Sequence, residues 1–126
     1  MRQILLSILS GVILISCSES APPEEELYQT ARDYEAAMEF NNALSAYDTI
    51  IEKYPDSPNR YKAIFMKGYI YTDLLKDKNK AIEALDTLLA QYPDCDLADD
   101  AMILRQIAEK GADLMSVFDD STKSEK

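Results

Sequence analysis

Few side chains in this chain are of the kind that carry out chemistry. Its 126 residues include no histidine, three glycines and two cysteines, Cys17 and Cys95. Activation of a serine or cysteine nucleophile usually depends on a neighbouring base such as histidine. A phosphate-binding loop needs several closely spaced glycines. The sequence therefore predicts that the protein is not an enzyme and uses no cofactor.

One acidic cluster could in principle hold a metal ion. It consists of Asp94, Asp96, Asp99 and Asp100. A calcium loop also needs a central glycine and a terminal glutamate, and this segment has neither. The aspartates resemble linker and N-cap residues instead. We therefore expect no metal site, and we expect Cys95 in the same loop to be a spectator, because no histidine is present to activate its thiol.

Cys17 stands directly after an apolar stretch. Residues 4–15 hold only two serines and one glycine besides aliphatic side chains, and Arg2 precedes them. This length suits the core of a signal peptide and is too short for a permanent membrane-spanning helix. The ending Leu-Ile-Ser-Cys resembles the bacterial lipoprotein signal, in which the cysteine thiol takes up the lipid. The alternative is an ordinary secretory signal with a cysteine at this place by chance.

The lipoprotein resemblance implies a location. It makes residues 1–16 a signal peptide and residues 17–23 a lipidated cysteine with a short linker, so the mature protein is expected to be held at a membrane by acyl chains. Ser18 after the cysteine resembles lipoproteins of the outer membrane that face the periplasm. The net charge of −10 argues against nucleic acid as a partner and against electrostatic attraction to anionic lipid.

The rest of the chain contains an internal repeat. Residues 43–56 and 81–94 match at a constant offset of 38, with the same Ala, Asp-Thr and Tyr-Pro-Asp positions in both copies. A period of this size is typical of stacked helical repeats, in which a single unit cannot bury its own apolar face.

Turn residues divide the chain into five expected helices. The first follows Pro22 and Pro23, and Asn41 and Asn42 are expected to end it and to cap the second helix. Ser57 is expected to cap the third. Gly111 either ends the fifth helix or is tolerated within it. The second to fifth helices are expected over residues 43–53, 58–76, 80–91 and from about 97 onward.

Both units resemble the tetratricopeptide repeat. In that family a small residue opens the second helix of each unit, and large apolar residues and a proline follow at fixed spacing. The matching residues are Ala43, Tyr47, Ile50 and Pro55, and again Ala81, Leu85, Leu88 and Pro93. In the first helix of each unit they are Leu27, Ala31 and Tyr34, and Ile64, Gly68 and Tyr71. The separation of Gly68 from Ala81 is one residue longer than that of Ala31 from Ala43, so an extra residue is expected in the second turn.

The resemblance implies an all-α fold. We expect an antiparallel helix-turn-helix array of about two repeats plus a C-terminal capping helix over residues 24–118, followed by a polar tail at residues 119–126. Leu114, Met115, Val117 and Phe118 are apolar. The last helix is therefore expected either to cap the array or to present its open end to a partner.

In this family the first helices of the units line a concave surface that binds other proteins. The positions carried over from the family are Tyr28, Arg32, Glu35, Lys62, Phe65, Tyr69, Thr72, Asp73, Asp100, Ile103 and Ile107. Phe65 and Tyr69 lie one helical turn apart and could form an aromatic shelf for a peptide. The alternative for Phe65 is packing against neighbouring helices.

A narrower resemblance links the lipoprotein signal, the Tyr-Pro-Asp-Ser-Pro linker at residues 54–58 and the long period. These features resemble exported proteins of the outer-membrane assembly type (BamD-like) and the cell-division coordinator type (CpoB/YbgF-like), although those have more repeats. The expected function is a membrane-anchored adaptor that binds another envelope protein. The alternative is an accessory lipoprotein with a small ligand or an enzymatic role.

Overall fold

The structure, a computed structural model, describes residues 21–111, and this part of the chain is built from helices and short turns. The α-helices are α1 Glu24–Ala36, α2 Phe40–Lys53, α3 Arg60–Tyr69, α4 Lys78–Gln91 and α5 Ala98–Lys110. A π-helix, η1 Ile70–Leu74, continues α3. The predicted all-α fold is confirmed. The predicted signal peptide, Cys17 and residues 112–126 lie outside the described residues.

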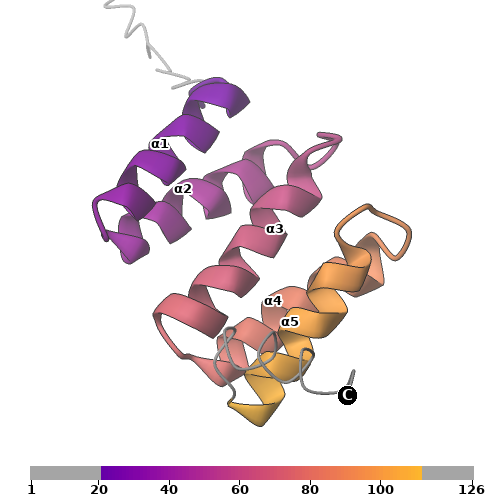
Figure 1. The fold of residues 1–126 in the computed structure, drawn as a ribbon. Coiled ribbons are helices and arrows are strands. Elements are labelled where there is room, and N and C mark those ends of the chain that lie inside the picture. Colours follow the sequence, from indigo (N-terminus) through magenta and orange to yellow (C-terminus); the bar gives the residue numbers. More distant parts are fainter. Residues whose placement is uncertain (1–20, 112–126) are drawn as a thin grey trace, which may run out of the picture.

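The helices form successive antiparallel pairs. α1 packs against α2, α3 packs against α4, and α5 packs against α4 as the first helix of a further unit. Figure 1 shows α1 and α2 at one end of the molecule, α4 and α5 at the other, and α3 between them. We call α1, α3 and α5 the A helices, and α2 and α4 the B helices.

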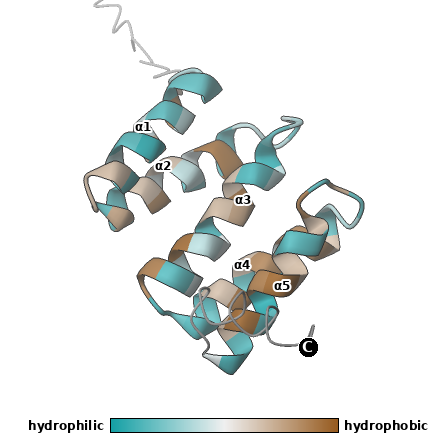
Figure 2. Ribbon diagram, viewed as in Figure 1, coloured by the Kyte–Doolittle hydropathy of each residue, from teal (hydrophilic) through white to brown (hydrophobic). Residues whose placement is uncertain are grey.

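The repeated apolar positions form the core. Six of them are at most 1% exposed: Ala43, Tyr47, Ile50, Ala81, Leu85 and Leu88. One cluster joins α1, α2 and α3, and a second joins α3, α4 and α5, with Tyr69 packed against both. Figure 2 shows α1 as largely hydrophilic and brown stretches on the helices that follow it. Helix α3 is thus the central element of both clusters.

The turn between α1 and α2 differs from the prediction. Asn41 and Asn42 do not end α1; both lie inside α2, and the Asn42 amide donates a hydrogen bond of 2.6 Å to the Glu39 carboxylate. The chain reverses instead at Met38, whose backbone is left-handed with φ 60°. Lys76, 38 residues later in the corresponding turn, has φ 53°. The two units therefore share a turn geometry that their side chains do not reveal.

The extra residue of the second unit lies in a helix and not in the turn. Gly68 corresponds to Ala31 and Lys76 to Met38, so the additional residue falls between 69 and 75. This interval contains η1, in which the Leu75 amide donates to the Ile70 carbonyl at 2.9 Å. A single turn of π-helix takes up one inserted residue without interrupting the helix. The expectation of a longer turn was wrong for this reason.

Other helix ends shift by about one turn or less from the predicted places. α3 begins at Arg60, and the Ser57 hydroxyl accepts a 3.0 Å hydrogen bond from the Asn59 amide in the preceding turn instead of capping the helix. α4 begins at Lys78, because the Asp77 carboxylate caps it by accepting from the Lys80 amide at 3.2 Å. Gly111 ends α5 in the left-handed conformation, with φ 64°. Of the two roles expected for Gly111, it therefore has the first, which is to end the helix.

An ion pair recurs between successive units. Asp48 on α2 pairs with Lys67 on α3, and Asp86 on α4 pairs with Arg105 on α5. Both residues of the second pair lie 38 positions beyond those of the first. Helix α5 is therefore placed on α4 in the same register as α3 on α2, which makes it the A helix of a third unit.

Candidate functional site

A groove runs between α1 and α3 and ends at the loop before α5. Its inner cavity has a volume of about 750 Å³. Ten side chains line it: Tyr28, Arg32, Glu35, Ala36, Tyr47, Lys62, Phe65, Met66, Asp96 and Leu97. They come from α1, α2, α3 and the loop that joins α4 to α5, so the site exists only once the units are stacked.

A second cavity adjoins the first and extends the groove. This outer cavity, of about 500 Å³, shares Tyr28, Arg32 and Lys62 with the inner one and adds Glu25, Gln29 and Asn59. Lining residues of the two cavities recur at each turn of α1 from residue 25 to residue 36, a length of about 16 Å at 1.5 Å per residue. We call both cavities together the α1–α3 groove. It is long enough for about five residues of extended chain.

Two tyrosines fix the wall of the groove. Their rings meet edge to face, with the centroids of Tyr28 and Tyr47 at 6.0 Å. The Tyr28 hydroxyl donates to the Asn59 carbonyl and the Tyr47 hydroxyl donates to the Glu35 carboxylate, each at 2.6 Å. Burial raises the pKa of Tyr28 to about 12, with a smaller contribution from the Glu24 charge. Burial, and next the hydrogen bond to Glu35, also raises the pKa of Tyr47.

Positive charge gathers where the two cavities meet. Arg32 and Lys62 are exposed and line both cavities. Within residues 21–111 neither forms an ion pair, although the Lys62 ammonium lies 5.8 Å from the ring centroid of Tyr61. Four other cations of this part of the chain are paired: Lys67, Lys76, Lys80 and Arg105. The groove thus offers two cations that form no ion pair, beside the acidic residues Glu25, Glu35 and Asp96.

Comparison with known families identifies the repeat. Residues 27–57 and 62–94 match the model of the tetratricopeptide repeat. The chain belongs to this family. No match was found among curated proteins or among solved structures. The tetratricopeptide repeat is a protein-interaction scaffold that typically carries out no catalysis, and the protein is accordingly assigned as a scaffold that binds other proteins.

The structure brings together part of the surface expected for a tetratricopeptide array. Five of the predicted residues line the groove together: Tyr28, Arg32, Glu35, Lys62 and Phe65. Tyr69 and Asp73 lie further along α3 and η1, half-buried, with the Tyr69 hydroxyl 3.5 Å from the Asp73 carboxylate. Asp100 and Ile103 are exposed on α5 outside the groove. Phe65 is half-buried, so it contributes both to the groove and to the second core cluster.

Two predicted contact residues are in fact buried. Thr72 is 6% exposed, and its hydroxyl donates to the Gly68 carbonyl at 2.8 Å. Ile107 is 4% exposed. Both lie where η1 meets α5, in the lining of a small cavity of about 240 Å³, and not on an open surface. The prediction of an accessible surface at these positions was wrong.

Sequence reasoning missed half of the lining residues. Ala36 and Met66 follow predicted residues by one position, and Tyr47 was expected only as core. Asp96 and Leu97 reach the groove from the loop before α5. The tetratricopeptide pattern places residues on helix faces, but it does not show which loop closes a groove, because that depends on how tightly successive units stack.

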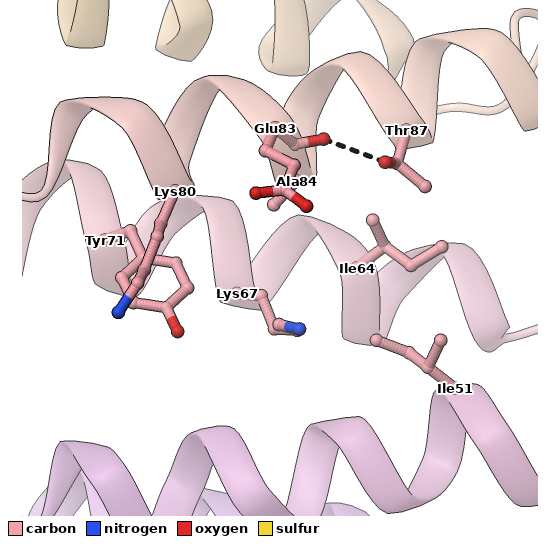
Figure 3. Close-up of a pocket in the computed structure, with 8 residues that line it drawn as sticks. All are labelled: Ile51, Ile64, Lys67, Tyr71, Lys80, Glu83, Ala84 and Thr87. Carbon is pink, nitrogen blue, oxygen red and sulfur yellow. Dashed lines mark hydrogen bonds between the residues drawn. The ribbon is translucent and has the colours of Figure 1, made fainter.

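Another cavity lies on the side of the B helices. It measures about 290 Å³ and lies between α2, α3 and α4, as Figure 3 shows. Its two lysines are already engaged, since Lys67 pairs with Asp48 and Lys80 pairs with Asp77 and lies 5.5 Å from the Tyr71 ring centroid. Compared with the groove, this cavity is smaller and offers fewer free polar groups to a partner.

Residues 21–111 contain no group of three or more His, Cys, Asp or Glu side chains arranged to hold a metal ion. None of the helices within these residues is both long and apolar enough to cross a membrane. Cys95 is a free thiol, half-buried against the second core cluster.

Proposed function

We propose that this protein is a membrane-anchored adaptor of the bacterial cell envelope that holds a partner protein in the α1–α3 groove. The single observation that carries the proposal is the assembly of five predicted contact residues, from two different A helices, into one groove. Aromatic and apolar side chains with a few converging polar groups are typical of surfaces that bind peptide segments.

The anchoring part of the proposal is supported by the sequence around Cys17. Four residues lie between Cys17 and Pro22, whose carbonyl accepts a 2.5 Å hydrogen bond from the Tyr54 hydroxyl. A linker of this length reaches at most about 18 Å. A lipid on Cys17 would therefore hold the Tyr54 end of the first unit close to the membrane, on the periplasmic side of the outer membrane if Ser18 acts as a sorting signal.

The expected partner is a protein of an envelope complex. The Tyr-Pro-Asp-Ser-Pro linker at residues 54–58 and the long repeat favour a role in an outer-membrane assembly complex or in another envelope complex of similar construction. With the linker so short, the partner must also be at the membrane or reach it from the periplasm.

A crosslinking pull-down tests the adaptor role. The full chain is expressed in a bacterial host, crosslinked in cells and recovered from detergent-solubilised membranes. We expect a stoichiometric protein partner that is lost with Phe65→Ala and retained with the control Met102→Ala, since Met102 is an exposed apolar residue on α5 outside the groove. Recovery of the protein alone, with a saturable small ligand, would contradict the adaptor role and support the alternative of an accessory lipoprotein.

Anchoring is tested separately. Wild-type protein should incorporate radiolabelled palmitate and sediment with membranes, and Cys17→Ala should do neither. Cys95→Ala serves as the control, because it removes the other cysteine of the chain. Membrane association that persists in the Cys17 variant would overturn the lipid anchor.

A further inference from the structure

We infer that the α1–α3 groove selects an extended segment of its partner that carries one acidic side chain next to a large apolar side chain. The inference rests on the proposed function, because it states the chemistry of the segment that the adaptor binds. It follows from the order of charged and apolar side chains along the groove.

The middle of the groove is cationic. Arg32 on α1 and Lys62 on α3 line both cavities, so they stand where the inner and outer cavities meet. Neither forms an ion pair with a carboxylate of residues 21–111. A carboxylate between them would form charge-assisted hydrogen bonds, which are stronger than bonds between neutral groups. Four other cations of residues 21–111 also form no ion pair, so what distinguishes Arg32 and Lys62 is that they line one groove together.

The inner cavity suits an apolar side chain. Phe65, Met66 and Leu97 contribute apolar surface, and Tyr28 and Tyr47 contribute ring faces and edges. Its acidic residues, Glu35 and Asp96, would repel a second carboxylate there. The Tyr47 hydroxyl donates to the Glu35 carboxylate at 2.6 Å, and this hydrogen bond favours the position of Glu35 at the groove. The segment is therefore expected to place its acid between the cations and its apolar residue beyond them.

The outer cavity favours a carboxylate on a side chain over one at a chain end. It continues the groove past the two cations with the polar residues Glu25, Gln29 and Asn59. A segment that fills both cavities passes between Arg32 and Lys62, and only a side chain can then present a carboxylate to them. Glu25 makes a second acid at this end unfavourable as well.

Selection from a displayed library tests the inference. Short random segments, fused at both ends within a phage coat protein so that no terminus is free, are selected against the full chain in detergent. We expect enrichment of segments with one Asp or Glu adjacent to an aromatic or aliphatic residue. Selection against Arg32→Glu/Lys62→Glu should instead enrich Lys or Arg at the same place, while the control Lys53→Glu/Lys110→Glu should keep the acidic preference, because both of its lysines are exposed outside the groove.

Affinities then measure the acidic contribution. For an enriched segment, made as a peptide with both ends blocked, replacing the acid by its amide should weaken binding to the wild-type chain by about tenfold or more. The same replacement should change the affinity for the Arg32→Glu/Lys62→Glu variant little. Circular dichroism of each variant checks that the helices remain folded.

The outcomes separate the inference from the function on which it rests. Enriched segments that lack acids but depend on Phe65 would overturn the inference and leave the adaptor role standing. Failure to enrich any segment would overturn both this inference and the assignment of the groove as a binding site. A peptide of residues 112–126, which contains Phe118 followed by Asp119 and Asp120, is assayed beside the selected segments. If it binds in the groove more tightly than they do, the occupant is the chain itself and the inference is overturned.

Discussion

Tyr47 joins the hydrophobic core to the wall of the groove. Its ring is 1% exposed, while its hydroxyl reaches the half-buried Glu35 carboxylate at 2.6 Å. One side chain thus packs α2 against α1 and also fixes an acidic group that faces the groove. A partner that contacts Glu35 therefore contacts a group held by the core, which favours a preorganised site over a loose one.

Removing the Tyr47 hydroxyl tests this coupling. Tyr47→Phe should lower the free energy of unfolding by about 1 kcal/mol, because a partly buried hydrogen bond to a carboxylate is lost while the packing is kept. The measurement is urea denaturation followed by circular dichroism. Tyr34→Phe is the matched control, since within residues 21–111 the Tyr34 hydroxyl has no hydrogen-bond partner and its removal should change stability little. Equal effects of the two substitutions would show that the Glu35 contact contributes nothing.

The groove tyrosines should also make the fold sensitive to alkaline pH. The unfolded chain releases tyrosine protons near pH 10, whereas the folded chain holds the Tyr28 proton until about pH 12 and the Tyr47 proton beyond its ordinary pKa. Above pH 10 the folded state binds more protons than the unfolded state, so stability falls with rising pH. The contribution is fully present below pH 10. Urea midpoints measured between about pH 9 and 12 should therefore decrease.

The double variant Tyr28→Phe/Tyr47→Phe provides the check on that alkaline loss. Its midpoints should fall less steeply, with a residual slope from Tyr61 and Tyr69, whose pKa values are also raised. A wild-type midpoint that stays constant up to pH 12 would mean that the two hydroxyls ionise as readily in the fold as in water.

At the residue level, the sequence predicts the groove only in part. Arg32, Lys62 and Phe65 follow from the family pattern, because each A helix presents the same turns toward the same side. Thr72 and Ile107 were assigned to that surface by the same pattern. The pattern failed there because both side chains lie in the seam between η1 and α5, where they are buried.

Among the elements, α3 and α4 lie close together at Gly68, where Leu85 of α4 packs against the α3 backbone. A Cβ atom at this position would lie 2.6 Å from Leu85 Cδ2 and 2.7 Å from its Cγ, and Leu85 is fully buried. The Cγ atom is a branch point and not a flexible tip, so the whole side chain would have to move. This explains why the smallest residue occupies the position that the repeat pattern reserves for small side chains.

Gly68→Ala should destabilise the fold by about 1–2 kcal/mol. Overpacking a core costs about 1–3 kcal/mol, and the better helix propensity of alanine offsets up to about 1 kcal/mol of this. Leu85→Val in the same chain should relieve part of the loss, because the crowded atoms are those of Leu85. Thermal unfolding of both single variants and the double variant measures this coupling. Additive losses would show that the two residues do not interact.

The π-helix gives a second test at this scale. Deleting Asp73 restores the residue count of the first unit and should convert η1 into ordinary α-helix, with the turn at Lys76 kept. Deleting Glu83 from the middle of α4 is the control, since it rotates all later side chains by about 100° and turns Leu85 and Leu88 out of the core. We expect a cooperative unfolding transition for the first deletion and none for the second, measured by urea denaturation. Loss of folding in both would show that the inserted residue is required.

The sequence predicted the helices better than their junctions. Apolar spacing and the prolines after each B helix located α2 and α4 within a few residues. The Asn41-Asn42 pair was misleading, because asparagine is also accommodated within the first turn of a helix when a nearby carboxylate, here that of Glu39, accepts from its amide. Met38 gave no warning of a left-handed turn, since methionine has no preference for that conformation.

For the whole molecule, the C-terminal end of the array is closed by α5, which packs on α4 with one face and is polar on the other. Helix α5 meets α4 through the repeated ion pair of Asp86 with Arg105, as α3 meets α2. On its other face, Gln106 and Glu109 stand where α3 has Gly68 and Tyr71, and both are exposed. A polar face without a small residue does not favour close approach of a further B helix. This supports the role of α5 as a cap, although Met102 and Ile103 remain 46% and 49% exposed beside it.

The N-terminal end of the array, which is formed by α1, should unfold locally most easily. Helix α1 has two buried residues, Leu27 and Ala31, whereas α2 and α5 have five each, and α1 packs chiefly on α2. In a repeat array each unit is stabilised by its neighbours, so a terminal helix with little buried surface exchanges its amide protons first. Hydrogen exchange followed by mass spectrometry should show faster exchange in α1 than in α2, α4 or α5.

A peptide bound in the α1–α3 groove contacts both helices, and it should slow exchange in α1 far more than in α4. Equal protection of α1 and α4 in the free protein would mean that the array opens only as a whole.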